Sequence, residues 1–249
     1  MKISAVMACY NSGATVARAV ESFLLQDHPE RELVVVDGAS KDETCAVVQG
    51  FGSPLVSLAS GPDRGIYDAI NKGIVRAGGE VIGILHSNDR FAHPHVLSRV
   101  AEAFAAEDLD AVFADVTFHP PGQPDRVIRR YDSSHFRPER IPAGAMPAHT
   151  ALFLHRRVFE AHGLYRTDYR IAGDFEFVAR VFRDGRLRWR HVPEVWVRME
   201  AGGASTSGLK SKILGTQEVR RACRENGIAT SYPRILSKYP RKLLELVRH

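Results

Sequence analysis

The fold is decided by residues 63–89, which read DRGIYDAINKGIVRAGGEVIGILHSND. The first part of this stretch predicts a helix over 66–77, ended by Gly78-Gly79. Residues 81–85 form a continuous apolar run, which is typical of a strand buried on both faces. The polar group His86-Ser87-Asn88-Asp89 follows directly. Because ligands of an open parallel sheet bind beyond the carboxyl ends of its strands, this unit predicts a site as well as a fold class.

The same alternation of strand and helix signals runs through the first half of the chain. It predicts an α/β fold with a Rossmann-like, mostly parallel central sheet, flanked by helices on right-handed crossovers. After Asp115 the alternation stops, and residues 119–148 are rich in Pro, Gly and His, which predicts a long irregular connection. The predicted strands are 3–7, 33–36, 55–58, 81–85, 111–114, 151–154, 187–192 and 194–199, and a small second sheet is expected beside the central one. Later helices are predicted over 174–182 and 213–225.

Composition excludes several classes of protein. With 249 residues, 44% hydrophobic and 25% charged, the chain resembles an ordinary globular protein and not a disordered one. Three cysteines cannot make a disulfide framework, and they predict reduced thiols in the cytoplasm. No apolar run approaches the roughly 18 residues that span a bilayer, and residues 1–4 lead directly into a strand-like run, which predicts no signal peptide.

The positive charge is concentrated at one end of the chain. Residues 209–249 hold ten basic and three acidic side chains, whereas residues 1–208 hold 24 and 26. We therefore do not expect a uniform nucleic-acid-binding surface. We expect instead a local contact between the basic end of the chain and an anionic surface. The aromatic content of 8%, without aromatic and basic residues interleaved at one place, also argues against single-strand binding.

Polar residues follow four successive predicted strands, and the parallel topology puts them on one edge of the sheet. Asp37, after the second strand, suits the hydroxyls of a ribose or the edge of a base. Residues 40–43 have the spacing of a capping box at a helix start. No Gly-x-Gly-x-x-Gly turn follows the first strand, so a diphosphate would be neutralised elsewhere. A divalent metal on Asp89 and a cation such as Arg64 are the candidates.

Four stretches together resemble family 2 glycosyltransferases, which have the nucleotide-sugar-binding GT-A fold. They are DRGIYDAINKG (63–73), ILHSND (84–89), HTALF (149–153) and YRIAGDFEF (169–177). The resemblance runs from Ile3 to about Ser207 and is to a bacterial subgroup that builds surface polysaccharides or glycolipids. It implies an inverting enzyme that moves a sugar from a nucleoside diphosphate, most commonly UDP, to a glycan or lipid-linked acceptor. It also implies a divalent metal, Mn²⁺ or Mg²⁺.

The resemblance assigns roles to the residues that match the family pattern. One acid would be the general base, because the attacking hydroxyl must lose a proton; another would be the metal ligand, within the Asp-x-Asp-like motif. The implied roles are Asp174 as base; Asp89 as metal ligand beside Ser87 and Asn88; Ala8, Tyr10 and Asp37 at the base and ribose; Arg64, Asp68 and Lys72 at the diphosphate or sugar; and His149 and Glu176 at the acceptor.

The chain departs from the family pattern at two positions. Many members have two adjacent acids where this chain has Asn88-Asp89, and an amide is a neutral and weaker metal ligand. Many members also carry Arg where this chain has Ile70. Arg64 or Lys72 would supply the missing positive charge.

Two other functions remain open on the sequence. A nucleotidyltransferase acting on a sugar phosphate also uses an α/β sheet and metal-binding acids, but it normally needs an early Gly-rich basic loop, and residues 8–13 contain no Lys or Arg. The other alternative is a non-catalytic nucleotide- or sugar-binding module.

The expected organisation is a transferase domain over 1–208 and a basic helical extension over 209–249. The domain would comprise a nucleotide-sugar half, 1–115, and an acceptor half, 116–208. Residues 233–249 mix basic side chains with leucines, which suits a helix on an anionic membrane surface and would make the protein peripheral on the inner face. A solvated helix that packs its leucines on the body is the alternative.

Overall fold

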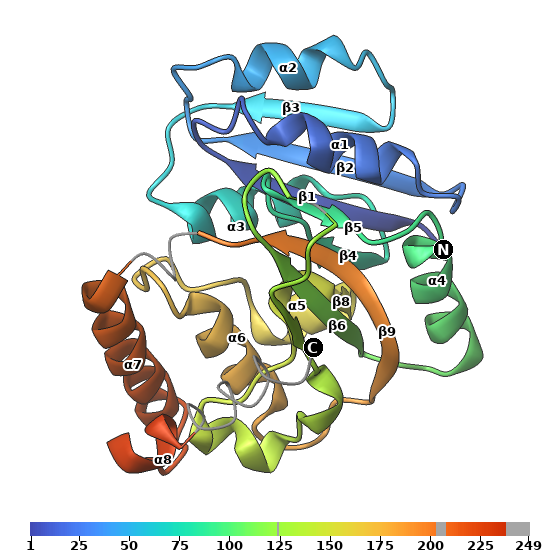
Figure 1. Ribbon diagram of the computed structural model, residues 1–249. Coiled ribbons are helices and arrows are strands. Elements are labelled where there is room, and N and C mark those ends of the chain that lie inside the picture. The colour runs from blue at the N-terminus through green and yellow to red at the C-terminus, as the bar shows by residue number, and fades with distance from the viewer. Residues whose placement is uncertain (124, 203–207, 238–249) are drawn as a thin grey trace.

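The computed structural model describes residues 1–123, 125–202 and 208–237, and Figure 1 shows them as one sheet surrounded by helices. The elements in chain order are β1 (Ile3–Cys9), α1 (Val16–Leu24), β2 (Arg31–Asp37), α2 (Thr44–Gly50), β3 (Val56–Ser60), α3 (Ile66–Arg76), β4 (Val81–Ile84), β5 (Asp89–Phe91), α4 (Val96–Ala106), β6 (Ala111–His119), β7 (Arg129–Tyr131), η1 (Ser133–His135), η2 (Pro138–Ala143), η3 (His149–Ala151), β8 (Leu152–His155), α5 (Arg156–His162), α6 (Gly173–Phe182), β9 (Trp189–Glu200), α7 (Gly208–Glu225) and α8 (Tyr232–Leu236).

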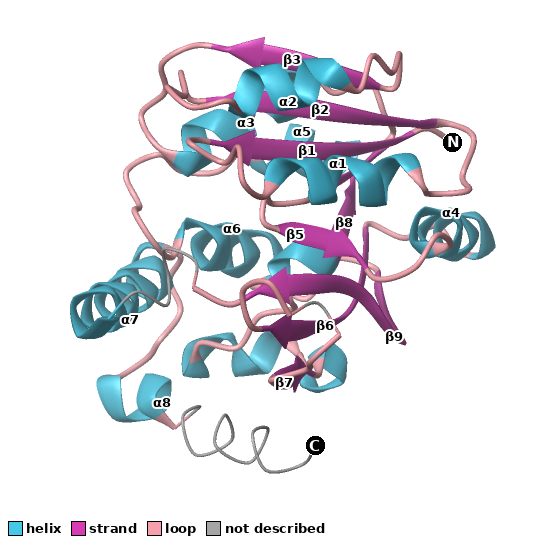
Figure 2. Ribbon diagram, turned by 45° about the horizontal axis from the view of Figure 1, so that its top comes forward, coloured by secondary structure: helices cyan, strands magenta, loops and turns pink. Residues whose placement is uncertain are grey.

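The sheet has the strand order β3-β2-β1-β4-β8-β6-β9-β5, and β7 pairs with β6. The first four strands are mutually parallel, as the alternation of strands and helices predicts. Figure 2 shows the arrowheads of β1, β2 and β3 at the same edge. The α/β fold class is therefore confirmed, and the carboxyl ends of these strands form one edge of the molecule.

The expectation of a separate small second sheet is wrong, because all nine described strands belong to one hydrogen-bonded sheet. The predicted strands 187–192 and 194–199 are one continuous strand, β9, despite Pro193. β9 runs parallel to the whole of β6, with register shifts on either side of Asp115. Such irregularities bend a strand and increase its twist. The sheet therefore curls from its parallel half into the β6–β9–β5 region without a break (Figure 1).

Apolar side chains from the two faces of the sheet make two cores. One core includes Val6 and Val36 and packs against α3, α6 and α7, and the other includes Met7 and Val35 and packs against α1 and α4. Neighbouring residues of β1 and β2 thus serve opposite faces, as the two-residue period of a strand requires. Residues buried on both faces explain why these strands appear as continuous apolar runs.

The described part of the C-terminal extension packs on the body of the protein. Val219, Ala222 and Cys223 of α7 and Ile235 of α8 are buried in the same core as α6. For residues 233–237 this favours packing over a membrane helix, and the remainder of the predicted membrane segment, 238–249, lies outside the described residues. Among the described helices, none has the length and apolar character needed to cross a membrane.

Candidate functional site

The ends of β1 and β4 meet at the edge that the sequence predicts for the site. The Ser87 hydroxyl lies 2.9 Å from the Ser12 hydroxyl and joins the two loops directly. Tyr10, the first residue after β1, is 59% exposed, and Ala8 is buried within β1. Tyr10 therefore offers an aromatic ring to solvent at this edge, while Ala8 contributes to the core beneath it.

Asp37 lies at the end of β2, fully buried, and its carboxylate is already satisfied. It accepts hydrogen bonds from the Ser40 backbone at 3.0 Å, from the Ser60 hydroxyl at 2.7 Å and from the Ser40 hydroxyl. Burial alone would raise the pKa of Asp37, but these hydrogen bonds hold it below its usual value. The capping box expected at Ser40 is wrong, because α2 begins only at Thr44 and Ser40 bonds to Asp37 instead.

Arg64, Asp68 and Lys72 form one ion-pair group at the start of α3. Asp68 lies 3.0 Å from the Arg64 guanidinium and 2.9 Å from the Lys72 ammonium. The hydrogen bonds from Lys72 and Arg64 lower the pKa of Asp68 to about 2. The structure therefore brings these three predicted residues together, and their net charge is +1. Asp68 partly neutralises the two expected cations, Arg64 and Lys72.

Asp89 is a buried acid whose carboxylate lacks a well-formed hydrogen bond to the described residues. It is 2% exposed, and neither of its carboxylate oxygens makes a hydrogen bond of normal geometry within the described chain. Burial raises the pKa of Asp89 to about 8, the nearby Glu200 backbone opposes that rise, and the charge of Glu200 adds to it. A buried carboxylate whose oxygens lack hydrogen-bond donors is the arrangement that a divalent cation would satisfy.

Three arginines line a hollow at Asp89, and they come from three distant parts of the chain. Arg18 lies on α1, Arg90 on β5 and Arg198 on β9. Arg18 contacts Glu200 at 3.0 Å. Burial, and then the charges of Arg198 and Arg18, lower the pKa of Arg90. Cations crowded in this way favour an anionic ligand. Arg90 directly follows Asp89 in the chain, but no motif connects Arg18 and Arg198 with them, so the sequence does not predict this group.

Asp174 lies at the first turn of α6, and α3 determines its surroundings. The Tyr67 hydroxyl accepts a hydrogen bond from the Gly173 backbone at 2.9 Å, donates one to the Ile171 carbonyl at 2.8 Å, and lies 3.5 Å from the Asp174 carboxylate. The Tyr67 ring would lie 2.6 Å from a Cβ at position 173, so only glycine fits there. Burial raises the pKa of Asp174, against lowering by the Phe175 backbone and by His86.

Two histidines, His86 and His149, lie side by side at the end of β4. His86, three residues before Asp89, interacts electrostatically with Asp174. Its ring lies 5.9 Å from that of His149, whose Nε2 is 2.9 Å from the Tyr165 hydroxyl. Burial lowers the pKa of both histidines to about 4, so both are neutral at pH 7. The structure thus brings His149 and Asp174 to His86, whose backbone carbonyl accepts a hydrogen bond from the Asp89 amide at 3.0 Å.

Glu176 is not brought to this site. It is 1% exposed, and its two carboxylate oxygens pair with the Arg180 guanidinium at 2.9 and 3.0 Å. The Asn226 side-chain amide adds a third contact at 3.3 Å. The carboxylate therefore has its partners inside the protein, and the predicted acceptor contact would require this buried ion pair to open.

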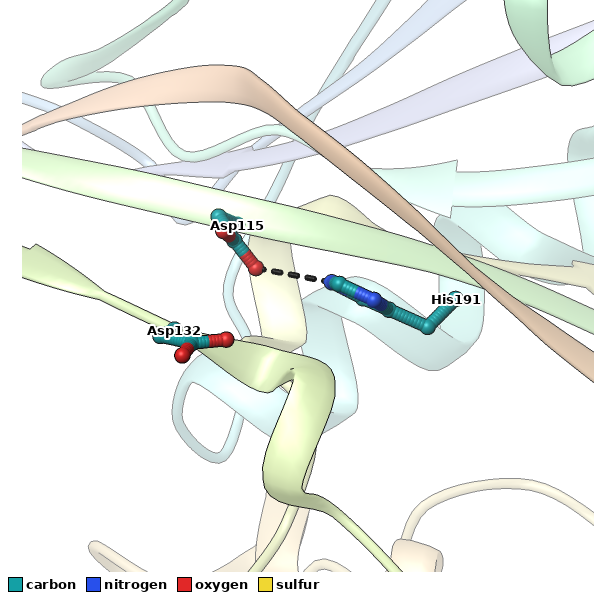
Figure 3. Close-up of side chains that lie close together, drawn as sticks. All are labelled: Asp115, Asp132 and His191. Carbon is teal, nitrogen blue, oxygen red and sulfur yellow. Dashed lines mark hydrogen bonds and ion pairs between the residues drawn. The ribbon is translucent and has the colours of Figure 1, made fainter.

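A second group of possible metal ligands lies away from Asp89, at Asp115, Asp132 and His191 (Figure 3). These residues offer ligand atoms within 4.8 Å of one another, so the group could hold a metal ion. Asp115 already accepts hydrogen bonds from the Arg130 guanidinium at 2.7 and 3.0 Å and from the Ser133 backbone at 2.9 Å, and it contacts His191 at 2.8 Å. A metal there would compete with these partners, whereas the Asp89 carboxylate makes no hydrogen bond of normal geometry to a described residue.

Comparison with known sequences gives a consistent family. A family model described as Glycosyl transferase family 2 matches residues 4–163. A Mycobacterium tuberculosis protein named PGL/p-HBAD biosynthesis glycosyltransferase is 29% identical over 217 residues, which cover 85% of this chain and 82% of the relative.

Solved structures of glycosyltransferases share the fold. S. aureus TarS in complex with UDP-GlcNAc matches with a TM-score of 0.70 and 17% identity over 89% of this chain. The mannosyltransferase PcManGT from Pyrobaculum calidifontis, in complex with GDP-Man and Mn²⁺, matches with a TM-score of 0.68 and 20% identity over 95% of this chain. The chain spans 66% of the TarS chain and 68% of the PcManGT chain. These matches confirm the predicted GT-A fold.

Proposed function

The chain belongs to glycosyl transferase family 2 and is a glycosyltransferase, and from that premise we propose the reaction. It transfers a sugar from a nucleoside diphosphate, with UDP as the first candidate, to a hydroxyl of a glycan or lipid-linked acceptor, with inversion at the anomeric carbon. The observation that carries the proposal is a buried acid, Asp89, and a half-buried acid, Asp174, that both lie by His86 at the carboxyl end of β4. Asp89 lacks hydrogen-bond partners among the described residues, and Asp174 lies beside His86.

A divalent cation fits the donor set at Asp89. The carboxylate oxygens are the hard ligands that Mg²⁺ and Mn²⁺ prefer, and they are buried without a donor. Asn88, whose side chain lies 3.4 Å from the Glu200 carbonyl, offers at most a neutral ligand oxygen. When bound, such a cation would offset the charge that develops on the leaving diphosphate. The bound Mn²⁺ of PcManGT supports the choice of cation.

Asp174 accepts the proton of the acceptor hydroxyl as that hydroxyl attacks the sugar. The raised pKa of its carboxyl makes the ionised form a stronger base than an exposed aspartate. His86, which interacts with Asp174, is neutral, so it does not neutralise the carboxylate by forming a fixed ion pair. Tyr67 orients the first turn of α6 from the other side, which keeps the carboxylate in one place.

The arginines around Asp89 stabilise the leaving diphosphate. The sequence suggests Arg64 or Lys72 for the positive charge that is missing at Ile70, but both pair with Asp68 on α3 and neither lines the hollow at Asp89. Arg18, Arg90 and Arg198 lie in the same hollow as Asp89, so a phosphate near the metal would also be near guanidinium groups. We therefore propose that these arginines supply the missing charge.

The remaining assignments stay predictions of the sequence. They are the contacts of Tyr10 and Asp37 with the nucleoside, the role of residues 116–208 in acceptor binding, and a cytoplasmic location with peripheral membrane contact. A relative named for PGL/p-HBAD biosynthesis and one named for succinoglycan biosynthesis support an acceptor of glycan type.

Nucleotide-dependent thermal stability tests the proposed donor class. A ligand present at about 100 times its Kd adds about 2.7 kcal/mol, which corresponds to a Tm rise of roughly 5–10 °C for a chain of this size. We expect that rise with UDP or GDP together with Mn²⁺, and a smaller one without the metal. A response to nucleoside triphosphates alone would point to a nucleotidyltransferase and would contradict the proposal.

A further inference from the structure

The backbone that leads into Asp174 is held by a glutamate of the C-terminal extension. Glu218, on α7, accepts three hydrogen bonds from consecutive backbone amides. One oxygen accepts from Arg170 at 2.9 Å, and the other accepts from Ile171 and Ala172 at 2.8 Å each. The Glu218 side chain is buried, at 6% exposure. A buried carboxylate that collects three successive N–H groups fixes the path of that loop.

Helix α7 approaches the same loop closely at a second point. A Cβ built on Gly215 would lie 3.4 Å from the Ile171 side chain. Gly215 and Glu218 are three residues apart, so they share one face of the helix. Tyr67 holds Ile171 and Gly173 from the opposite side, through its hydroxyl. The segment before the proposed base is therefore clamped between α3 and α7.

We propose that Glu218 is a positioning residue for Asp174: by binding the amides of residues 170–172 it places the first turn of α6, and with it the base, against the acceptor hydroxyl. The inference rests on the proposed function of Asp174. It gives the C-terminal extension an indirect part in catalysis, since α7 contributes this carboxylate from outside residues 4–163, the range of the family match.

The chemistry of the contact explains why a carboxylate is needed. A glutamine at 218 has the same size but presents an N–H₂ group where one oxygen stood, so at least one backbone N–H would face another donor. Shorter side chains would leave all three amides without their acceptor, which is costly in a buried loop. Glu218→Gln is therefore the informative variant, because it keeps the volume and changes only the acceptor set.

A matched control is available on the same helix. Glu225 lies two turns further along α7 and contacts the Tyr169 hydroxyl at 2.7 Å and the Arg166 guanidinium at 2.8 Å. The structure gives it no hydrogen bond to the amides of 170–172. Glu225→Gln thus removes a negative charge from α7 while the loop contacts of Glu218 stay in place.

The experiment measures kcat, the donor KM and amide hydrogen exchange in the full chain for Glu218→Gln, Glu225→Gln and Asp174→Asn. For Glu218→Gln we expect kcat to fall about 10-fold or more, because a small displacement of a catalytic group is costly. The donor KM should stay within about twofold, because the carboxylate does not touch the donor. The amides of residues 170–172 should exchange faster in this variant alone.

The outcomes separate this inference from the proposed function. A wild-type kcat in Glu218→Gln, with Asp174→Asn inactive, would overturn the positioning role and leave the base in place. Equal losses in Glu218→Gln and Glu225→Gln would also overturn it, since they would indicate general loosening of α7. An active Asp174→Asn variant would overturn the proposed base, and the inference with it.

Discussion

Asp174→Asn is expected to yield a folded protein whose kcat for sugar transfer is at least about 100-fold below that of the wild type. A positioned general base typically contributes a factor of this size, and an amide cannot take up the proton of the acceptor hydroxyl. We expect the variant to be about as stable as the wild type, because desolvation disfavours the ionised form of the carboxyl that the variant removes.

The dependence of the wild-type kcat on pH should report the ionisation of Asp174. Burial raises the pKa of Asp174 above its ordinary value of 3.8, so its ionised, active form is lost at a higher pH than for an exposed aspartate. The acid limb of kcat against pH is therefore expected above that value, and it should be absent from any residual activity of Asp174→Asn. Asp184→Asn, beyond the end of α6, is the matched control and should behave as wild type. Near-wild-type turnover of Asp174→Asn would refute the assignment.

Asp89→Asn is expected to abolish stimulation by Mn²⁺ while making the metal-free protein more stable at alkaline pH. Burial raises the pKa of Asp89 to about 8, so the folded state binds a proton that the unfolded state releases near pH 4. Its favourable contribution to stability is complete below about pH 4 and is lost as the pH rises toward 8. The amide variant has no charge to desolvate, and we expect its Tm at pH 8 to exceed that of the wild type by at least about 2 °C.

Thermal unfolding with and without Mn²⁺ at pH 5 and pH 8 checks the Asp89 prediction. Added Mn²⁺ should raise the Tm of the wild type at pH 8 and leave that of Asp89→Asn unchanged. Asp125→Asn is the control, because that carboxylate is 96% exposed and contacts Arg198 only at 4.0 Å. Equal stabilisation of wild type and Asp89→Asn by Mn²⁺ would place the metal elsewhere, and the Asp115 group would then be the next candidate.

Much of the fold follows from local patterns in the chain. Buried apolar runs predict the parallel strands β1, β2 and β4, and the polar group that follows β4 predicts the edge where Asp89 lies. The curl of the sheet is not local, because it depends on register shifts around Asp115 in the pairing of β6 with β9. The two strands predicted over 187–192 and 194–199 are therefore one strand, β9, of the continuous sheet.

Some residues of the candidate site are likewise predictable from local patterns, and others are not. Asp89 and Asp174 stand in recognisable motifs, so the sequence identifies them, although their burial and raised pKa values depend on tertiary packing. Glu176 stands two residues from Asp174 in its motif, yet helix geometry turns it toward Arg180. Arg198 and Glu218 reach the site from strands and helices far along the chain, and no spacing in the sequence connects them to it.

The most direct test of a nucleotide-sugar transferase is the identity of the nucleotide product. Purified protein is incubated with UDP-sugars and GDP-sugars and Mn²⁺, and in parallel with nucleoside triphosphates and sugar phosphates, and the products are separated by chromatography. The account predicts release of UDP or GDP from one of the nucleotide sugars, with the release lost in Asp174→Asn. Release of inorganic diphosphate from a nucleoside triphosphate, with no UDP or GDP formed from any nucleotide sugar, would contradict it.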